Sequence, residues 1–281
     1  MKPYLKLMRV HHYVKNALIF APLVFSGDFF RMEKLLSAVL AFVSFCFLSS
    51  AVYVVNDIRD VEKDRLHPTK CRRPIASGAV KIPAAWGLMA ALLVLSGVCH
   101  VLSGGSLISA LLPVVYFVLN LAYSFGLKNK PIVDIAILTS GFLLRVLYGA
   151  AVCSIEVSGW LYLTVISVSF YFSLGKRRNE LVRQGDGQTR QVLKYYTKAF
   201  LDKNMYMFLG LANVFYALWA MDNEKKAVIW TVPLVLLICM RYSLDIEGDS
   251  DGDPVEVLVH DKVLIALCLV LAAAMMGILY L

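Results

Sequence analysis

The polar residues 56–64, which read NDIRDVEKD, have the residue types and the spacing of a metal-binding motif. They follow an apolar run, and a helix continuing from it would place Asn56, Asp60 and Asp64 on one face, with Asp57 beside them. Carboxylates so close repel one another unless a cation neutralises them. Mg²⁺ suits such ligands, because it binds one or two carboxylates and keeps positions for phosphate oxygens. We therefore expect a magnesium–diphosphate site with Asp57, Asp60 and Asp64 as catalytic metal ligands.

A solvated acidic helix end is the simpler interpretation of the same residues. Arg59, Lys63 and Arg65 lie between or beside the carboxylates and could pair with them. The position directly after an apolar span favours the metal site. Lys70 and Arg73 follow at a place where membrane topology needs no further positive charge, so they favour phosphate binding.

The rest of the sequence indicates that this motif lies at the end of a membrane-spanning helix. The 281 residues are 59% hydrophobic and 17% charged, with a mean hydropathy of +0.68, whereas soluble domains carry about 25% charged residues. Because a spanning helix needs about 20 apolar residues, we expect an all-α integral membrane bundle that forms a single transmembrane catalytic domain over residues 1–281. The nine expected spans cover residues 16–30, 34–55, 82–102, 106–125, 131–152, 158–175, 204–221, 226–243 and 262–280.

The distribution of positive charge gives the expected orientation of the chain. With nine spans, all but five of the 28 Lys and Arg residues lie on the side of the N-terminus. Positive loops stay cytoplasmic, so we expect a multi-pass protein of the cell (inner) membrane with its N-terminus and active-site loops in the cytoplasm. Topology signals and contacts to anionic membrane lipids explain the net charge of +8 without nucleic acid as a partner. The five exceptions are Arg31, Lys34, Lys225, Lys226 and, within a span, Arg145.

The motif at residues 56–64 resembles the first aspartate motif of the UbiA prenyltransferase superfamily. Members of that superfamily have nine transmembrane helices, depend on Mg²⁺ and act on isoprenoid substrates at a site open toward the cytoplasm. The likeness in span number and loop positions covers nearly the whole chain. It implies that Asn56 joins the three aspartates as a substrate-binding residue.

A narrower resemblance is to the branch of that superfamily that makes decaprenyl-phosphoribose. Those enzymes transfer phosphoribose from 5-phosphoribosyl diphosphate (PRPP) to a polyprenyl phosphate. The segments that carry the likeness are HPTKCRRPIASG at 67–78, HYVKN at 12–16, YSFGLK at 123–128 and GKRRNE at 175–180. The resemblance implies a product for cell-wall biogenesis and substrate contacts from Lys15, Lys70, Arg73, Tyr123, Lys128, Lys176, Arg177 and Glu180.

The segment after the sixth expected span distinguishes between two donor substrates, a prenyl diphosphate and PRPP. Prenyl-transferring members carry a second aspartate motif there, which helps to hold a second Mg²⁺ on the prenyl diphosphate. This chain reads KRRNE at 176–180, where Glu180 is the acidic residue. PRPP carries a diphosphate at C1 and a phosphate at C5, so it suits a site with an acidic wall that binds Mg²⁺ and a basic wall that binds phosphate. The alternative role of Lys176, Arg177 and Arg178 is a stop signal at a cytoplasmic helix end.

These residues predict catalysis by positioning and electrostatics. Mg²⁺ would stabilise the charge that develops on the leaving diphosphate, and the phosphate oxygen of the polyprenyl phosphate would attack ribose C1 from the opposite face. Because that phosphate is ionised at neutral pH, no general base is required. We expect inversion at C1 and release of diphosphate.

Two other functions remain open on the sequence. The basic segment 176–180 argues against an aromatic prenyltransferase of the same fold, and the lack of a clear internal repeat argues against a membrane transporter. Arg145 is either a functional residue or a structural ion-pair partner, and Asp134 either caps a helix or joins a polar cavity. The acidic run 245–253 is interpreted as a solvated loop or a lid. The sequence is also compatible with a homo-oligomer.

Overall fold

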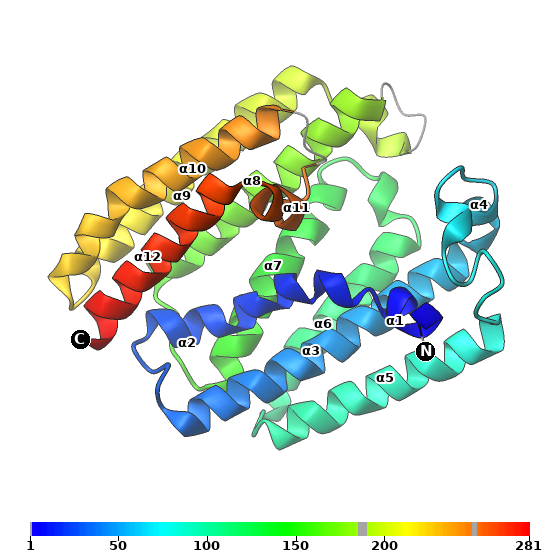
Figure 1. The fold of residues 1–281 in the computed structure, drawn as a ribbon, viewed down its shortest axis with the longest axis horizontal. Helices are drawn as coiled ribbons and strands as arrows, with labels where there is room; N and C mark the ends of the chain where they lie inside the picture. The colour runs from blue at the N-terminus through cyan, green and yellow to red at the C-terminus, as the bar shows by residue number, and fades with distance from the viewer. Residues whose placement is uncertain (1, 185–189, 249–251) are drawn as a thin grey trace. The chain divides into compact units, whose positions relative to one another are not determined.

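All elements in the described part of the chain are helical. The computed structural model describes residues 2–184, 190–248 and 252–281, and no strand occurs there. The longer helices are α3 (Met32–Arg59), α5 (Ile82–Leu102), α6 (Leu107–Ser124), α7 (Val133–Val152), α8 (Gly159–Gln184), α9 (Lys198–Asp222), α10 (Val232–Glu247) and α12 (Lys262–Tyr280) (Figure 1). The shorter elements are α1 (Lys2–Met8), α2 (Ala21–Phe25), α4 (Val61–Arg65), α11 (Pro254–His260) and the 3₁₀ helices η1 (Val10–Phe20), η2 (Lys70–Arg72), η3 (Leu127–Asn129), η4 (Gln191–Tyr195) and η5 (Lys226–Thr231).

Six helical segments in the described ranges are long and apolar enough to cross a membrane. They are α3, α5, α6, α7, α12 and the segment Lys226–Glu247, in which η5 leads into α10. The predictions of an all-α fold and of a multi-pass membrane protein are therefore confirmed.

The predicted number of nine spans is not confirmed. Apart from residue 158, the predicted spans 158–175 and 204–221 lie within α8 and α9, whose Ser, Thr, Tyr and Asn residues lower their hydropathy. The predicted span 16–30 is divided between η1 and α2. Pro22 lies at the start of α2, where its missing N–H removes a hydrogen bond from a longer helix through this point.

The chain divides into two compact units. Unit 1 consists of Met1–Leu23, Asp28–Phe125 and Leu144–Ile155, and unit 2 consists of Val24–Gly27, Gly126–Leu143 and Glu156–Leu281. Helix α7 contributes residues to both units. A single domain over residues 1–281 stays a prediction. The acidic run 245–253 includes residues 249–251, which lie outside the described residues.

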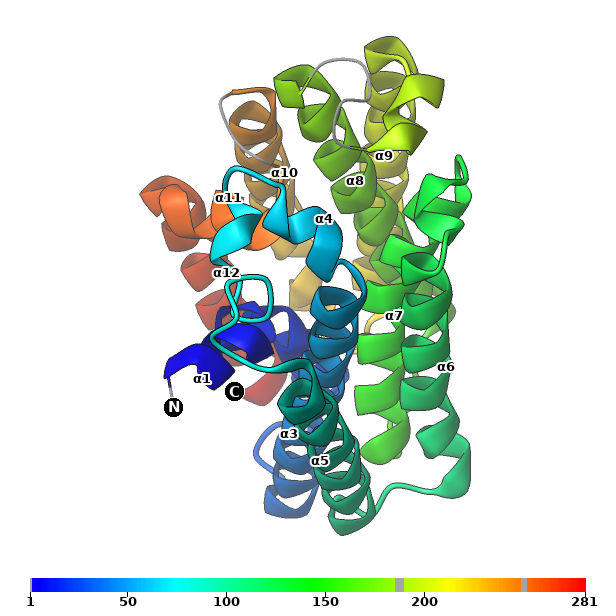
Figure 2. The same cartoon turned by 90° about the vertical axis from the view of Figure 1, so that its right-hand side faces the viewer.

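Unit 1 is built around α3. The apolar stretch of α3 is 67% buried, compared with 22% in α5 and 17% in α6, and α3 packs side by side with α5 (Figures 1 and 2). Small hydroxyl residues allow neighbouring backbones to approach, since Ser44 donates to the Ser96 carbonyl at 2.8 Å and Ser50 to the Met8 carbonyl at 2.9 Å. The polar residues at the C-terminal end of α3 therefore have fixed surroundings.

A glycine lets η1 pack directly on α7. A Cβ atom at Gly149 would lie 2.0 Å from the backbone oxygen of Ile19. Ile19 and Tyr148 are fully buried in the same apolar cluster. The close approach brings Asn16 of η1 to Arg145 of α7, and Arg145 Nε donates to Asn16 Oδ1 at 2.8 Å.

In unit 2, α8 packs along α9, and the residues after its predicted span remain helical. The buried residues Leu174, Leu201, Met205 and Ile246 form the centre of one apolar cluster. Gly175 allows the close approach to Ile246, because a Cβ atom there would lie 2.8 Å from its Cδ1. The charged residues 176–180 thus belong to a packed helix rather than to a loop.

We expect Gly149→Ala to destabilise unit 1. The added Cβ would meet a backbone oxygen, which cannot turn aside as a flexible side chain can, and overpacking of this kind costs about 2–3 kcal/mol. The matched control is Gly87→Ala in α5, where an added Cβ meets no atom within 4 Å and alanine favours the helix. Thermal unfolding of the purified protein should show a lower Tm for Gly149→Ala only. Equal Tm values for the two variants would contradict the close packing.

Candidate active site

The end of α3 and the start of α4 position the predicted metal ligands. Asp57, on the last turn of α3, and Asp64, in α4, are both 3% exposed. Asp60 lies between the two helices with φ −90° and ψ 8°, although its N–H still donates to the Asn56 carbonyl at 3.0 Å. The regular helix that the sequence predicted therefore ends at Arg59.

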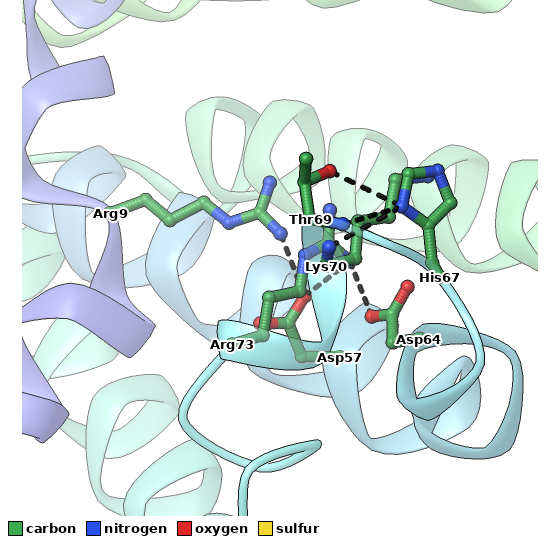
Figure 3. A network of polar contacts seen from close by, with 7 residues as sticks. All are labelled: Arg9, Asp57, Asp64, His67, Thr69, Lys70 and Arg73. Carbon is green, nitrogen blue, oxygen red and sulfur yellow. Dashed lines mark hydrogen bonds and ion pairs between the residues drawn. The ribbon is translucent and has the colours of Figure 1, made fainter.

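One arginine joins the two buried carboxylates. Arg73 Nη1 donates to Asp64 Oδ2 at 2.6 Å and to Asp57 Oδ1 at 3.2 Å (Figure 3). Arg9 Nη2 donates to the same Asp57 oxygen at 2.7 Å. We call Arg9, Asp57, Asp64 and Arg73 the carboxylate cluster. Its two cations offset the repulsion between its two anions, which allows both carboxylates to lie buried and close together.

Asp57, Asp60 and Asp64 do not form a group of three metal ligands. Among residues 2–184, 190–248 and 252–281, no three His, Cys, Asp or Glu side chains lie together as a metal-binding group. The predicted convergence of three carboxylates is therefore not found, because the chain leaves the helical path at Asp60. Asp60 is half-buried and has an interaction of its own, and its role as a metal ligand stays a prediction.

The donor set of the carboxylate cluster fits Mg²⁺ bound together with a phosphate. Asp57 and Asp64 approach the same nitrogen of Arg73, so their oxygens lie within a few ångströms of each other. Mg²⁺ commonly takes one or two carboxylates and leaves its remaining positions to water and substrate phosphates. The space between these carboxylates already suits positive charge, because a guanidinium occupies it.

The loop after α4 is ordered by His67. Its Nδ1 accepts hydrogen bonds from the backbone N–H groups of Thr69 at 3.2 Å and Lys70 at 3.4 Å (Figure 3). Ile75 anchors the far end of the loop in an apolar cluster of unit 1. The loop thereby brings Arg73 to the carboxylates, while Lys70 remains exposed on η2. A phosphate contact from Lys70 is compatible with this placement and stays a prediction.

A residue that the sequence did not single out holds Asn56. The Ser124 hydroxyl, at the end of α6, donates to Asn56 Oδ1. The predicted segment 123–128 contained this serine, but the sequence cannot show that α6 ends beside Asn56. Tyr123 is half-buried on the same turn, and Lys128 is half-buried in η3 of unit 2. Substrate contacts from Asn56, Tyr123 and Lys128 stay predictions.

Arg145 is 6% exposed inside unit 1. Its Nε donates to Asn16, its Nη2 donates to Tyr116 Oη at 3.2 Å, and its guanidinium lies 5.0 Å from the ring centroids of Phe45 and Tyr116. Neutral acceptors and aromatic faces stabilise a buried guanidinium. These contacts tie η1 to α6 and α7 and favour a structural role for Arg145. Lys15, next to Asn16, is half-buried, and its substrate contact stays a prediction.

A second charged cluster lies in unit 2 around Arg177. Its fully buried guanidinium donates through Nε to Asp134 Oδ2 at 2.6 Å and through Nη1 to Glu180 Oε2 at 2.5 Å. The Tyr196 hydroxyl donates to Asp134 Oδ1 at 2.6 Å and accepts from the Ile132 N–H at 2.7 Å. We call Asp134, Arg177, Glu180 and Tyr196 the Arg177 cluster. The Asp134 side chain thus accepts hydrogen bonds within a buried network.

This arrangement argues against the predicted phosphate contact of Arg177, which stays a prediction. A guanidinium enclosed by two carboxylates, with no exposed surface, does not present its N–H groups to a substrate. The sequence could not show this, because Asp134 lies 43 residues earlier in the chain. Arg178 is also buried and donates to Asp202 at 2.9 Å and to the Ile246 carbonyl at 3.1 Å.

Lys176 is the accessible cation of the predicted trio 176–178. Its side chain is 33% exposed. Its Nζ lies 3.5 Å from Asp253 Oδ2, which is longer than a typical charged hydrogen bond. Gly252 makes this approach feasible, since a Cβ atom there would lie 2.9 Å from Lys176 Cα. The positive φ of Gly252, +77°, also favours glycine. Among these three cations, Lys176 is the one that fits a phosphate contact.

Glu180 is surrounded by cations. Burial opposes ionisation of its carboxyl, but Arg177, Arg190 and Lys176 outweigh that effect and hold the pKa of Glu180 below its ordinary value. Arg190 Nε lies 3.5 Å from Glu180 Oε2. A carboxylate engaged by several cations has little remaining attraction for a metal ion. The predicted substrate contact of Glu180 stays a prediction.

Comparisons with known proteins identify relatives over most of the chain. The sequence profile described as the UbiA prenyltransferase family matches residues 18–260. The decaprenyl-phosphate phosphoribosyltransferase of Corynebacterium glutamicum is 36% identical over 277 residues, which cover 94% of this chain and 83% of that protein. The protein of the same name from Mycobacterium tuberculosis H37Rv is 35% identical over 277 residues, which cover 94% of this chain and 90% of that protein.

A solved structure shares the fold. The UbiA homolog from Archaeoglobus fulgidus bound to DMAPP and Mg²⁺ superposes with a TM-score of 0.75 and covers 98% of both chains. At 18% sequence identity, this likeness concerns the fold alone.

We expect Arg177→Met to destabilise unit 2 by about 3–5 kcal/mol, because it leaves the buried Asp134 without its cation and removes one of the cations around Glu180. The control is Arg183→Met, which removes the same charge from an exposed position on the same helix. Thermal unfolding should give a strongly lowered Tm for Arg177→Met and a nearly unchanged Tm for Arg183→Met. A wild-type Tm in the Arg177 variant would contradict the buried ion pairs.

Proposed function

The chain belongs to the UbiA prenyltransferase family and is an enzyme, and we propose that it transfers 5-phosphoribose from PRPP to a polyprenyl phosphate of the decaprenyl type. The relatives from C. glutamicum and M. tuberculosis, whose names state this acceptor and the phosphoribosyl group, support the proposal over most of the chain. The observation that carries it is the carboxylate cluster, in which two buried carboxylates and two guanidiniums lie together. Such a cluster offers ligands for both halves of a metal–diphosphate complex.

Mg²⁺ is the metal that we propose for this cluster. Asp57 and Asp64 would hold it, and Asp60 is a further candidate ligand. The fold neighbour from A. fulgidus was solved with Mg²⁺ and a prenyl diphosphate, which supports a divalent metal in this fold. When bound, the metal supplies positive charge to the leaving diphosphate. Arg73 and Lys70 lie on the loop beside these carboxylates and would bind the phosphate oxygens of the donor.

The second charged segment favours PRPP over a prenyl diphosphate. Glu180 is engaged by cations and Arg177 is enclosed, so this segment lacks the free carboxylates that a second metal ion needs. Lys176 remains accessible and would bind a phosphate. A donor that needs a single metal–diphosphate site fits a chain whose segment 176–180 has its one carboxylate engaged by cations.

The transfer requires the leaving diphosphate and the attacking acceptor phosphate to lie on opposite faces of ribose C1. The bond from C1 to the diphosphate oxygen breaks, and a bond from C1 to an oxygen of the polyprenyl phosphate forms on the opposite face. The acceptor oxygen carries negative charge at neutral pH, so no side chain has to remove a proton. The excess of positive charge in the loops on the N-terminal side supports a site at the cytoplasmic face.

An aromatic prenyltransferase is the second candidate, because the fold neighbour from A. fulgidus was solved with DMAPP. The two candidates differ in their donor.

Purified protein with Mg²⁺, polyprenyl phosphate and PRPP labelled in the ribose should give a labelled lipid, and addition of a chelator should stop its formation. Transfer from a labelled prenyl diphosphate to an aromatic acceptor, without transfer from PRPP, would replace the proposal with this alternative.

We expect Asp57→Ala and Asp60→Ala to reduce phosphoribosyl transfer to background, a loss of about 10³-fold or more, because each removes a proposed metal ligand. The matched control is Glu62→Ala, which removes a carboxylate of the same segment whose side chain is 80% exposed. This control should keep nearly full activity in the PRPP assay. Full activity of the Asp57 variant would rule out the metal assignment of the cluster, and full activity of the Asp60 variant would limit it to Asp57 and Asp64.

A further inference from the structure

Arg9 belongs to the carboxylate cluster although no sequence motif contains it. Its Nη2 lies 2.7 Å from Asp57 Oδ1, the same oxygen that Arg73 approaches at 3.2 Å (Figure 3). The carboxylate of Asp57 is 3% exposed, while the side chains of Arg9 and Arg73 are 22% and 28% exposed. The carboxylates are thus enclosed, and the two cations that neutralise them lie on the open side of the cluster.

The backbone of Arg9 is strained, and its side chain is partly exposed beside the cluster. Arg9 adopts the left-handed conformation, with φ 52° and ψ 51°, at the break between α1 and η1. This conformation costs a residue other than glycine about 1–2 kcal/mol. The guanidinium also lies 4.8 Å from the ring centroid of Tyr53, a cation–π contact that adds to the ion pair with Asp57. Such strain persists only where surrounding contacts compensate for it.

We propose that Arg9 and Arg73 are exchangeable counterions: they neutralise Asp57 and Asp64 while no metal is bound, and they turn to the diphosphate oxygens of the donor when the carboxylates bind the metal. This inference rests on the proposed metal–diphosphate role of the cluster but not on the identity of the group that is transferred. It extends the site to Arg9, which the motif at residues 56–64 does not contain.

Charge balance supports the exchange. Without a metal, two guanidiniums match two carboxylates. A divalent cation added alone would leave the enclosed group with excess positive charge, which is unfavourable in a low-dielectric site. A metal–diphosphate complex brings its own negative charge, and the freed guanidiniums can form charge-assisted hydrogen bonds to it. The metal and the diphosphate therefore bind as one complex, and the metal alone binds weakly.

The test compares a metal ion alone with its diphosphate complex. Purified full-length protein is titrated with Mn²⁺, and free Mn²⁺ is measured by its electron paramagnetic resonance signal, first without and then with inorganic diphosphate. Arg9→Gln should bind Mn²⁺ alone about tenfold more tightly, because one competing cation is lost. It should bind the Mn²⁺–diphosphate complex about tenfold more weakly, because one phosphate ligand is lost.

Arg65→Gln is the matched control. It removes one positive charge from the same segment, but Arg65 pairs with the exposed Glu62 and does not contact Asp57 or Asp64 in the interactions described. It should change neither affinity more than about twofold. Arg9→Lys is the second variant, in case the glutamine variant does not fold. It keeps the charge but loses the planar guanidinium, which can donate two hydrogen bonds to one phosphate. We therefore expect it to bind Mn²⁺ alone as the wild type does and to bind the Mn²⁺–diphosphate complex more weakly.

Opposite shifts of the two affinities in Arg9→Gln identify Arg9 as an exchangeable counterion. Unchanged affinities, or the same shifts in Arg65→Gln, would overturn the inference while leaving the metal site in place. Loss of Mn²⁺ binding in Asp57→Asn supports the metal site independently of Arg9. Full Mn²⁺ binding in that variant would refute the metal role of Asp57 and the exchange together.

Discussion

Two buried carboxylates that share one guanidinium are the interaction on which the proposed chemistry of unit 1 depends. Asp57 comes from the most enclosed helix of the unit and Asp64 from the short helix that follows it, so only a cation between them makes their closeness tolerable. Arg73 supplies that cation from a loop whose path His67 fixes through two backbone hydrogen bonds. The surrounding structure thus keeps a place for positive charge next to the membrane-spanning part of the chain.

Arginines that contact buried groups have three different roles in this protein. Arg73 is partly exposed and bridges carboxylates that a metal would also bind. Arg145 lies among neutral acceptors and aromatic rings and joins three helical segments of unit 1. Arg177 is fully enclosed by the carboxylates of unit 2. Exposure and the charge of the partners, rather than the residue type, separate an arginine that can bind substrate from one that holds the fold.

Local patterns in the sequence predicted the features that depend on nearby residues. Apolar runs gave the positions of α3, α5, α6, α7 and α12, and the spacing of Asp57 and Asp64 indicated that they lie close together. Features that depend on distant residues were not predictable. Nothing in the spacing could show that Arg9 reaches Asp57, that Ser124 holds Asn56, or that Asp134 encloses Arg177. The break at Asp60 was also missed, because a helical wheel assumes a regular helix where the backbone turns.

The two anchors of η1 have a consequence for the permitted length of the amino-terminal segment. Arg9, directly before η1, pairs with Asp57, and Asn16, within η1, accepts a hydrogen bond from Arg145. An insertion or deletion of a single residue between them would rotate one anchor away from its partner, since successive helical residues point in different directions. Substitutions at the exposed positions His11 and Val14 change neither anchor. Chain length in this segment is therefore constrained more strongly than residue identity.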